Sequence, residues 1–245
     1  MRRTQAALAA ASLILGLAAA TPAFAGQTGT IRLRADYSGS DAYSANRGGE
    51  FRVDLFTGLN LPGVGPDVAV NGSYFQTFCL EYNEYIGFGK VYQWELSTAT
   101  DAGGVSGGQP DPLDARTAYL YTKFWSGTLG NYEYQDFGTA SDERAGSAGQ
   151  LQNAFWYLEG EISSLNHSSQ AWAWVQEAQH AVDNGLWSGI GSVRVLNITE
   201  RLSDGSIVKR QDQLVIVPLP PAAAAGMLLL GGLGALRRFR RRKTS

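Results

Sequence analysis

The sequence predicts an α+β fold in which an antiparallel β-sandwich or barrel carries a helical insertion. Hydrophobic and polar residues alternate toward both ends of the segment 26–217, as in half-buried strands, whereas 114–185 follows a helical period. The chain contains 10 Phe, 11 Tyr and 6 Trp and is only 17% charged, which is typical of a β-rich protein. The order of strands, helices and strands gives the fold class.

The alternating segments predict strands over 30–37, 51–55, 74–82, 91–96, 192–198 and 214–216. Three segments between the fourth and fifth strands predict helices, because apolar residues recur there every three or four positions. These helices are expected over 115–125 after the N-cap Asp114, through 148–158 after the N-cap Ser147, and from Ser169 to Asn184 before Gly185. The single globular domain is therefore expected to span 26–217.

The N-terminus has the features of a secretory signal peptide. Arg2 and Arg3 precede an apolar run over 6–20, and small residues occupy Ala23 and Ala25. This pattern predicts a signal peptide over 1–25 that is cleaved after Ala25 during export.

The C-terminus has three parts in order: Val217-Pro218-Leu219-Pro220, an apolar run over 222–236, and a basic cluster over 237–243. On its own this pattern fits a hydrophobic helix that anchors the chain in a membrane, with the basic end in the cytoplasm. It also resembles the PEP-CTERM class of sorting signals, in the variant that begins Val-Pro-Leu-Pro. The resemblance implies a bacterial envelope protein whose segment 218–245 sits transiently in the membrane until an exosortase-type protease cuts it. Release to the cell surface or an exopolysaccharide matrix would follow.

The charge of the middle of the chain narrows the choice of partners. Eight of the 20 basic residues lie in the two end segments, which contain no acidic residue, so 12 basic residues face 22 acidic ones in 26–217. The resulting net charge of −10 repels phosphates. Nucleic acid is therefore not expected as a partner.

Cys79 is the only cysteine and cannot form an internal disulfide. A buried, inert thiol is one interpretation of a lone cysteine in an exported protein. However, two motifs in order resemble those of the thioester domains of bacterial surface adhesins. They are Phe78-Cys79-Leu80-Glu81 on a predicted strand and Gln152-Asn153-Ala154-Phe155-Trp156 on a predicted helix. That resemblance implies a thioester between the Cys79 and Gln152 side chains, with Gln150 as a competing glutamine.

Other candidate groups favour structural or solvated roles. His167 and His180 lack partners at metal-ligand spacing, and Asp101, Asp111 and Asp114 lack the spacing of a calcium loop, so neither a metal nor a cofactor is expected. A Gly-x-Ser-x-Gly pattern around Ser106 lies in a loop without the strand and helix that a nucleophile elbow needs. Glu81 and Glu84 are expected to be solvated or to bind the helices.

These observations predict an exported surface or extracellular-matrix protein that is not an enzyme. It would bind a surface target or exopolysaccharide covalently through the Cys79–Gln152 thioester. The alternative is a non-covalent structural component of a biofilm matrix. A secreted hydrolase is the third choice, because no group of residues in the sequence matches a catalytic site better than chance would give.

Overall fold

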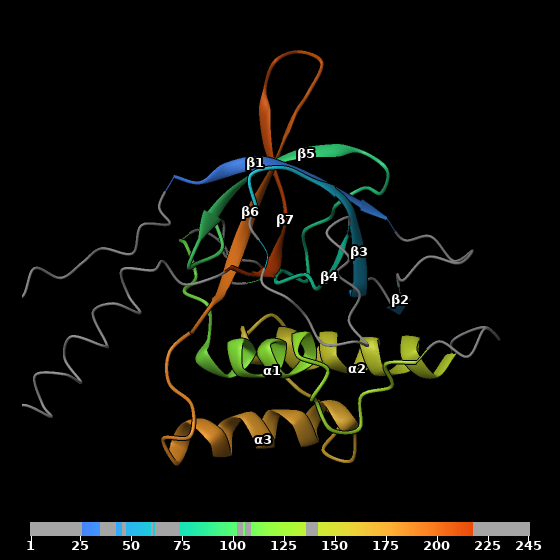
Figure 1. The fold of residues 1–245 in the computed structure, drawn as a ribbon, viewed down its shortest axis with the longest axis vertical. Coiled ribbons are helices and arrows are strands. Elements are labelled where there is room, and N and C mark those ends of the chain that lie inside the picture. Colours follow the sequence, from blue (N-terminus) through green and yellow to red (C-terminus); the bar gives the residue numbers. More distant parts are fainter. Residues whose placement is uncertain are drawn as a thin grey trace, which may run out of the picture.

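A computed structural model describes residues 26–34, 43–45, 48–59, 61, 74–101, 105, 109–135 and 142–217. A β-sheet forms one layer, helices α1 and α2 lie beneath it, and α3 lies below them (Figure 1). The α+β class is thus confirmed, with the helices inserted between β5 and β6 as the sequence predicts.

The sheet is antiparallel, and its main path runs β2-β3-β1-β5-β6-β7, with β4 also paired to β3. The strands are β1 (Thr28–Arg34), β2 (Tyr43–Ala45), β3 (Gly48–Phe56), β4 (Phe75–Thr77), β5 (Val91–Ser97), β6 (Val193–Arg201) and β7 (Ile207–Ile216). The short strand β2 was not expected from the sequence, and β7 begins seven residues earlier than predicted.

The strands form one open sheet, so the expectation of a sandwich or closed barrel is wrong. Strand β4 is only three residues long and pairs with β3. Beyond β4, the chain meets β7 through the isolated bridge between Cys79 and Gln213. A closed barrel needs continuous pairing between the first and last strands, and one bridge does not supply it.

The predicted strand over 74–82 is therefore mostly wrong, although residues 75–81 are buried. On one side, the residues that flank Cys79 pair with β7, since the N–H of Leu80 donates to the carbonyl of Asp212 and the N–H of Leu214 donates to that of Phe78. On the other side, the main chain of Cys79 forms hydrogen bonds with the side chain of Gln152 instead of with a second strand, which no local pattern in the sequence reveals.

The helices are α1 (Ala115–Trp125), α2 (Asp142–Leu158) and α3 (Gln170–Asp183). Asp114 caps α1, as predicted, and Ser169, where the third helix was expected to begin, caps α3; each side chain accepts a hydrogen bond from a first-turn N–H. The prediction that Ser147 caps α2 is wrong. Ser147 lies inside the helix, and its hydroxyl accepts the N–H of Glu133 at 3.1 Å instead.

The core lies between the sheet and α1 and α2. Rings from the chain after β4 and from both helices meet edge to face there: Phe78 lies 5.0 Å from Phe124 and 5.2 Å from Phe155 between ring centroids. The Tyr121 hydroxyl donates to the carbonyls of Gln76 and Leu214. These contacts hold α1 and α2 against β4 and β7.

The end segments on which export and sorting were predicted lie outside the described residues, including Ala23, Ala25, Pro218, Leu219 and Pro220. Val217 is described; it is buried, and its N–H donates to the carbonyl of Ser192 at 3.0 Å. Within the described part of the chain, no helix is both long enough and apolar enough to span a membrane.

Candidate functional site

The structure brings Cys79 and Gln152 together at the boundary between the sheet and the helical layer. Cys79 follows β4, and Gln152 lies on the face of α2 that packs against β2 and β3. Both residues are fully buried. Two residues that are 73 positions apart in the sequence are thus in direct contact.

The carboxamide of Gln152 is held by main-chain groups on two sides. Its Oε1 accepts the N–H of Cys79 at 3.1 Å and the N–H of Gly49 at 3.2 Å. Its Nε2 donates to the carbonyl of Cys79 at 2.8 Å. Two converging main-chain N–H groups on one carbonyl oxygen form the arrangement known as an oxyanion hole, which stabilises negative charge on that oxygen.

Gly48 and Gly49 make this arrangement possible. A Cβ at Gly48 would lie 2.5 Å from Cγ of Gln152 and 2.6 Å from Cη2 of Trp156, so only glycine leaves room for these two side chains. Gly49 has a φ of 124°, a conformation that residues with a side chain rarely adopt. The pair therefore lets β3 approach α2 closely enough to present the Gly49 N–H.

A buried ion pair fixes β3 relative to α2 beside the oxyanion hole. Glu50 follows Gly49 and forms a salt bridge with Arg144 of α2, with 2.5 Å between Nη2 and Oε1. The Tyr132 hydroxyl donates to the same carboxylate at 2.6 Å. Both members of the pair are almost fully buried. Since Arg144 lies on the same helix as Gln152 and Glu50 lies next to Gly49 on β3, this contact helps to set the position of Gln152 against Gly49.

The Cys79 thiol is in its protonated form. Burial raises the pKa of Cys79 well above its usual value, and the negative charge of Glu81 raises it further. The side chain of Gln213, which lies opposite Cys79 on β7, hydrogen-bonds the thiol and opposes this increase. A thiolate is the reactive species, so reaction requires a group that takes the proton.

The carboxyl group of Glu81 acts on the thiol, and Asp212 is a second buried carboxyl group that contacts Glu81. Glu81 is buried and its Oε2 accepts the N–H of Asp212 on β7 at 2.8 Å, whereas it was expected to be solvated or to bind the helices. Burial raises the pKa of Glu81 well above its usual value, and burial raises that of Asp212 to about 7. Burial also raises the pKa of Glu84, which is less deeply buried than Glu81. Burial thus favours the neutral form of both Glu81 and Asp212.

Aromatic rings from the chain after β4 and from α2 cover the site. Phe78 is fully buried, and Trp156 packs edge to face on Tyr82, with ring centroids 4.9 Å apart. Tyr119 lies elsewhere: its hydroxyl donates to Glu177 of α3. Water is therefore excluded from Gln152 chiefly by the α2 residue one turn later, Trp156.

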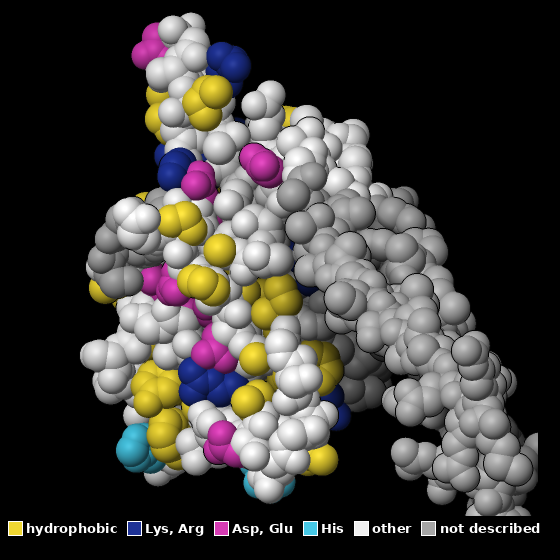
Figure 2. Space-filling view, turned by 90° about the vertical axis from the view of Figure 1, so that its left-hand side faces the viewer, with side chains coloured by type: hydrophobic (Ala, Val, Ile, Leu, Met, Phe, Trp, Pro, Cys, Tyr) yellow, Lys and Arg dark blue, Asp and Glu magenta, His cyan; other side chains and the backbone are white. Residues whose placement is uncertain are grey.

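The other sequence candidates do not join this site. The side chain of Gln150 accepts the N–H of Ala171 at 3.2 Å, so Gln152 is the glutamine at Cys79. His167 stacks on Trp172, and Figure 2 shows histidine side chains at the helical end of the molecule. Ser106 lies outside the described residues. No group of three potential metal-ligating residues occurs in the part of the chain that is described.

Asp101, Asp111 and Asp114 have separate roles rather than a shared one. Asp101 pairs with Lys209 at 3.1 Å, and the carbonyl of Asp111 accepts the N–H of Thr100. Asp114 caps α1 and binds Arg116. The carboxylates of Asp101 and Asp114 thus belong to two separate ion pairs.

Sequence reasoning found the two central residues but missed those that position them. Gly49, Glu50, Asp212 and Gln213 carry no motif, and each reaches the site through contacts distant in the sequence. The only local signal is the Gly48-Gly49 pair, which comes shortly before the predicted strand over 51–55.

Comparison of the chain with protein-family models, curated proteins and solved structures found no match. The case for function therefore depends on the geometry of this site and on the sequence motifs.

Proposed function

We propose that the chain is a bacterial surface protein that attaches covalently to its target through an internal thioester between Cys79 and Gln152. The observation that carries this proposal is the pair of N–H groups, from Gly49 and Cys79, on the carboxamide oxygen of Gln152. The sequence resemblance to adhesin thioester domains selects the same two residues independently.

The reaction balances without an external oxidant or cofactor. The sulfur of Cys79 forms a bond to Cδ of Gln152, and the bond from Cδ to Nε2 breaks. The thiol proton and the amide nitrogen leave as part of ammonia. A primary amine or hydroxyl on the target then attacks Cδ, forms an amide or ester, and returns the free thiol of Cys79. The protein acts once and does not turn over, so it is not an enzyme.

The arrangement of main-chain groups around the Gln152 amide supports the first step in two ways. It holds the amide against the main chain of Cys79, which replaces an encounter between free groups with a fixed approach. It also provides two hydrogen-bond donors for the oxygen that becomes negative when sulfur adds. In enzymes, one such donor accelerates the reaction by roughly 10²–10³-fold. Formation of the thioester relies on both effects, because amides are poor acyl donors.

The protonated thiol is the main barrier to this step. Glu81 provides a local acceptor, because its carboxyl group lies close enough for its charge to raise the pKa of the Cys79 thiol. The accepted proton then goes to the departing nitrogen. In this account Glu81 assists proton transfer and forms no covalent bond.

The end segments give this chemistry its setting. A signal peptide over 1–25 exports the chain, and the segment 218–245 passes through the membrane until an exosortase-type protease processes it. The domain is then displayed at the cell surface or in exopolysaccharide. In such a location a bond that survives dilution is more useful than reversible binding.

A second candidate is a non-covalent structural component of the matrix. The observation in its favour is that both polar atoms of the Gln152 amide are already hydrogen-bonded, as those of a structural buried glutamine would be. In this case Cys79 is a small buried core residue.

Amine capture distinguishes the two candidates. The full-length chain is incubated with methylamine, and peptides that contain Gln152 are analysed by mass spectrometry. The covalent proposal expects a methylamide at Gln152 and one new alkylatable thiol at Cys79. The variant Cys79→Ala must lose the methylamide, whereas Gln150→Ala, on the same helix, must keep it. An unmodified Gln152 in the wild-type chain would favour the structural candidate.

A further inference from the structure

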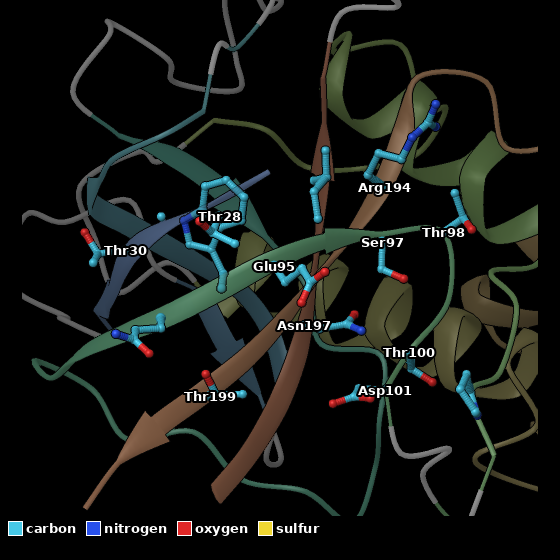
Figure 3. Close-up of a pocket in the computed structure, with 15 residues that line it drawn as sticks. Thr28, Thr30, Glu95, Ser97, Thr98, Thr100, Asp101, Arg194, Asn197 and Thr199 are labelled. Atoms are coloured by element: carbon cyan, nitrogen blue, oxygen red, sulfur yellow. The ribbon is translucent and has the colours of Figure 1, made fainter. Parts of the chain in front are cut away.

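A polar groove of about 810 Å³ crosses β1, β5 and β6 (Figure 3). Strand register places its side chains in two rows across the three strands. One row contains Thr28, Glu95 and Asn197, and the other contains Thr30, Gln93 and Thr199. On β5, Gln93 and Glu95 are exposed, whereas their neighbours Tyr92 and Trp94 are buried in the core. The rows therefore belong to the outer face of the sheet.

The groove offers hydroxyl and amide groups, and few charges. Hydroxyls and amides both donate and accept hydrogen bonds, so they match a ligand whose own groups do the same. A chain of sugar hydroxyls has this property throughout its length. Figure 3 shows Glu95, Ser97 and Asn197 where β5 crosses β6, with Thr100 and Asp101 beside them. Oxygen atoms from three segments of the chain thus surround one end of the groove.

Two of these oxygens lack a hydrogen-bond partner. Oγ1 of Thr100 and Oδ1 of Asn197 are buried without one, and Thr100 is only 5% exposed. Asn197 lies opposite a β-bulge, since Leu196 pairs with Gln213 but Ile198 pairs with Arg210. A buried polar atom without a partner is costly, and rotation of either side chain toward a donor in the groove would relieve that cost. The bulge and the two oxygens indicate a site for a hydrogen-bonding ligand.

The charges of the groove disfavour an anionic ligand. Glu95 and Asp101 are its carboxylates, and Asp101 already pairs with Lys209. Arg194 is its only cation among the described lining residues, and its guanidinium donates to the carbonyls of Gly191 and Val193. No cation is therefore placed to receive the carboxylates or sulfates of an acidic polymer.

We propose that this groove binds an uncharged glycan chain through its two rows of hydroxyl and amide side chains. This inference rests on the proposed function for the location of the protein at the cell surface. It adds the class of target that the protein binds there. Its chemistry is separate, because the groove residues do not contact Cys79 or Gln152 in the hydrogen bonds described above. Non-covalent binding at the groove is expected with or without a thioester.

Affinity electrophoresis tests the groove in the full-length Cys79→Ala chain, which cannot form the thioester. Native gels contain dextran, galactomannan or xyloglucan as uncharged polysaccharides, or alginate as an anionic one. At least one uncharged polysaccharide is expected to retard the chain, and alginate is not. Asn197→Ala and Thr100→Val are each expected to weaken binding by roughly five- to tenfold, the loss of about one hydrogen bond.

Gln93→Ala provides a variant at an exposed position, where substitution leaves the fold intact, and it is expected to weaken binding similarly. Gln176→Ala, exposed on α3, is the matched control and is expected to bind like the parent. Lack of retardation by all three uncharged polysaccharides, stronger retardation by alginate, or unchanged binding in the folded groove variants would each overturn the inference. None of these results bears on thioester formation, which the parent variant lacks.

Discussion

Substitution of Gly48 by alanine should prevent thioester formation while leaving both reacting residues in place. The added Cβ would lie 2.5 Å from Cγ of Gln152 and 2.6 Å from Cη2 of Trp156. Carbon atoms in ordinary contact are about 3.5–4.0 Å apart, so these side chains must move by about 1 Å. A shift of that size takes Oε1 beyond hydrogen-bond distance of the Gly49 and Cys79 N–H groups, now at 3.2 and 3.1 Å.

Loss of even one donor predicts thioester formation at least roughly 100-fold slower. Overpacking should also lower the free energy of unfolding by about 1–3 kcal/mol. The assay follows the fraction of chain that has lost ammonia, by intact mass, over time after purification. Gly146→Ala is the matched control, because it lies on α2 with open space around it, and it should form the thioester normally. A Gly48→Ala chain that is folded and forms the thioester at the wild-type rate would refute the reasoning.

Two further predictions concern the groups that support the site. Arg144→Met leaves Glu50 buried without its cation, so it should lower the free energy of unfolding by about 3–5 kcal/mol in urea denaturation; a loss under about 1 kcal/mol would contradict the role of this ion pair. Folding raises the pKa of Asp212 from its usual 3.8 to about 7, so the folded state retains a proton that the unfolded chain releases. Stability should therefore fall as pH rises from about 4 to about 7, by up to about 1.4 kcal/mol per pH unit. Asp212→Asn should flatten this slope, measured by urea denaturation across that range, and an identical slope in the variant would argue against a buried protonated carboxyl.

The elements that the sequence predicted correctly are those with local signals. Helix α1 begins after Asp114 and α3 ends before Gly185, because capping residues and glycine at a positive φ act within a few positions. The start of α2 was misplaced, because its first residues carry no strong apolar period and Ser147 resembles a cap.

The site was predictable only in part for the same reason. The motif around Cys79 and the motif around Gln152 are each visible in a few residues. The oxyanion hole is not, since Gly49 meets Gln152 across 103 positions of sequence. Likewise, Glu81 pairs with Asp212 across 131 positions, so its burial could not be inferred from its neighbours. Tertiary contacts, rather than local propensity, determine the chemistry of these groups.

The intact mass of the chain tests the central claim most directly. The full-length wild type and the Cys79→Ala variant are purified in parallel, and the peptides that contain Cys79 and Gln152 are analysed without reduction. The account predicts a wild-type mass about 17 Da below that of the unmodified sequence, the mass of ammonia, with Cys79 and Gln152 joined in one species. The variant should show no deficit. A wild-type chain of unmodified mass, with Cys79 alkylated only after unfolding, would contradict the thioester and leave Gln152 as a structural glutamine.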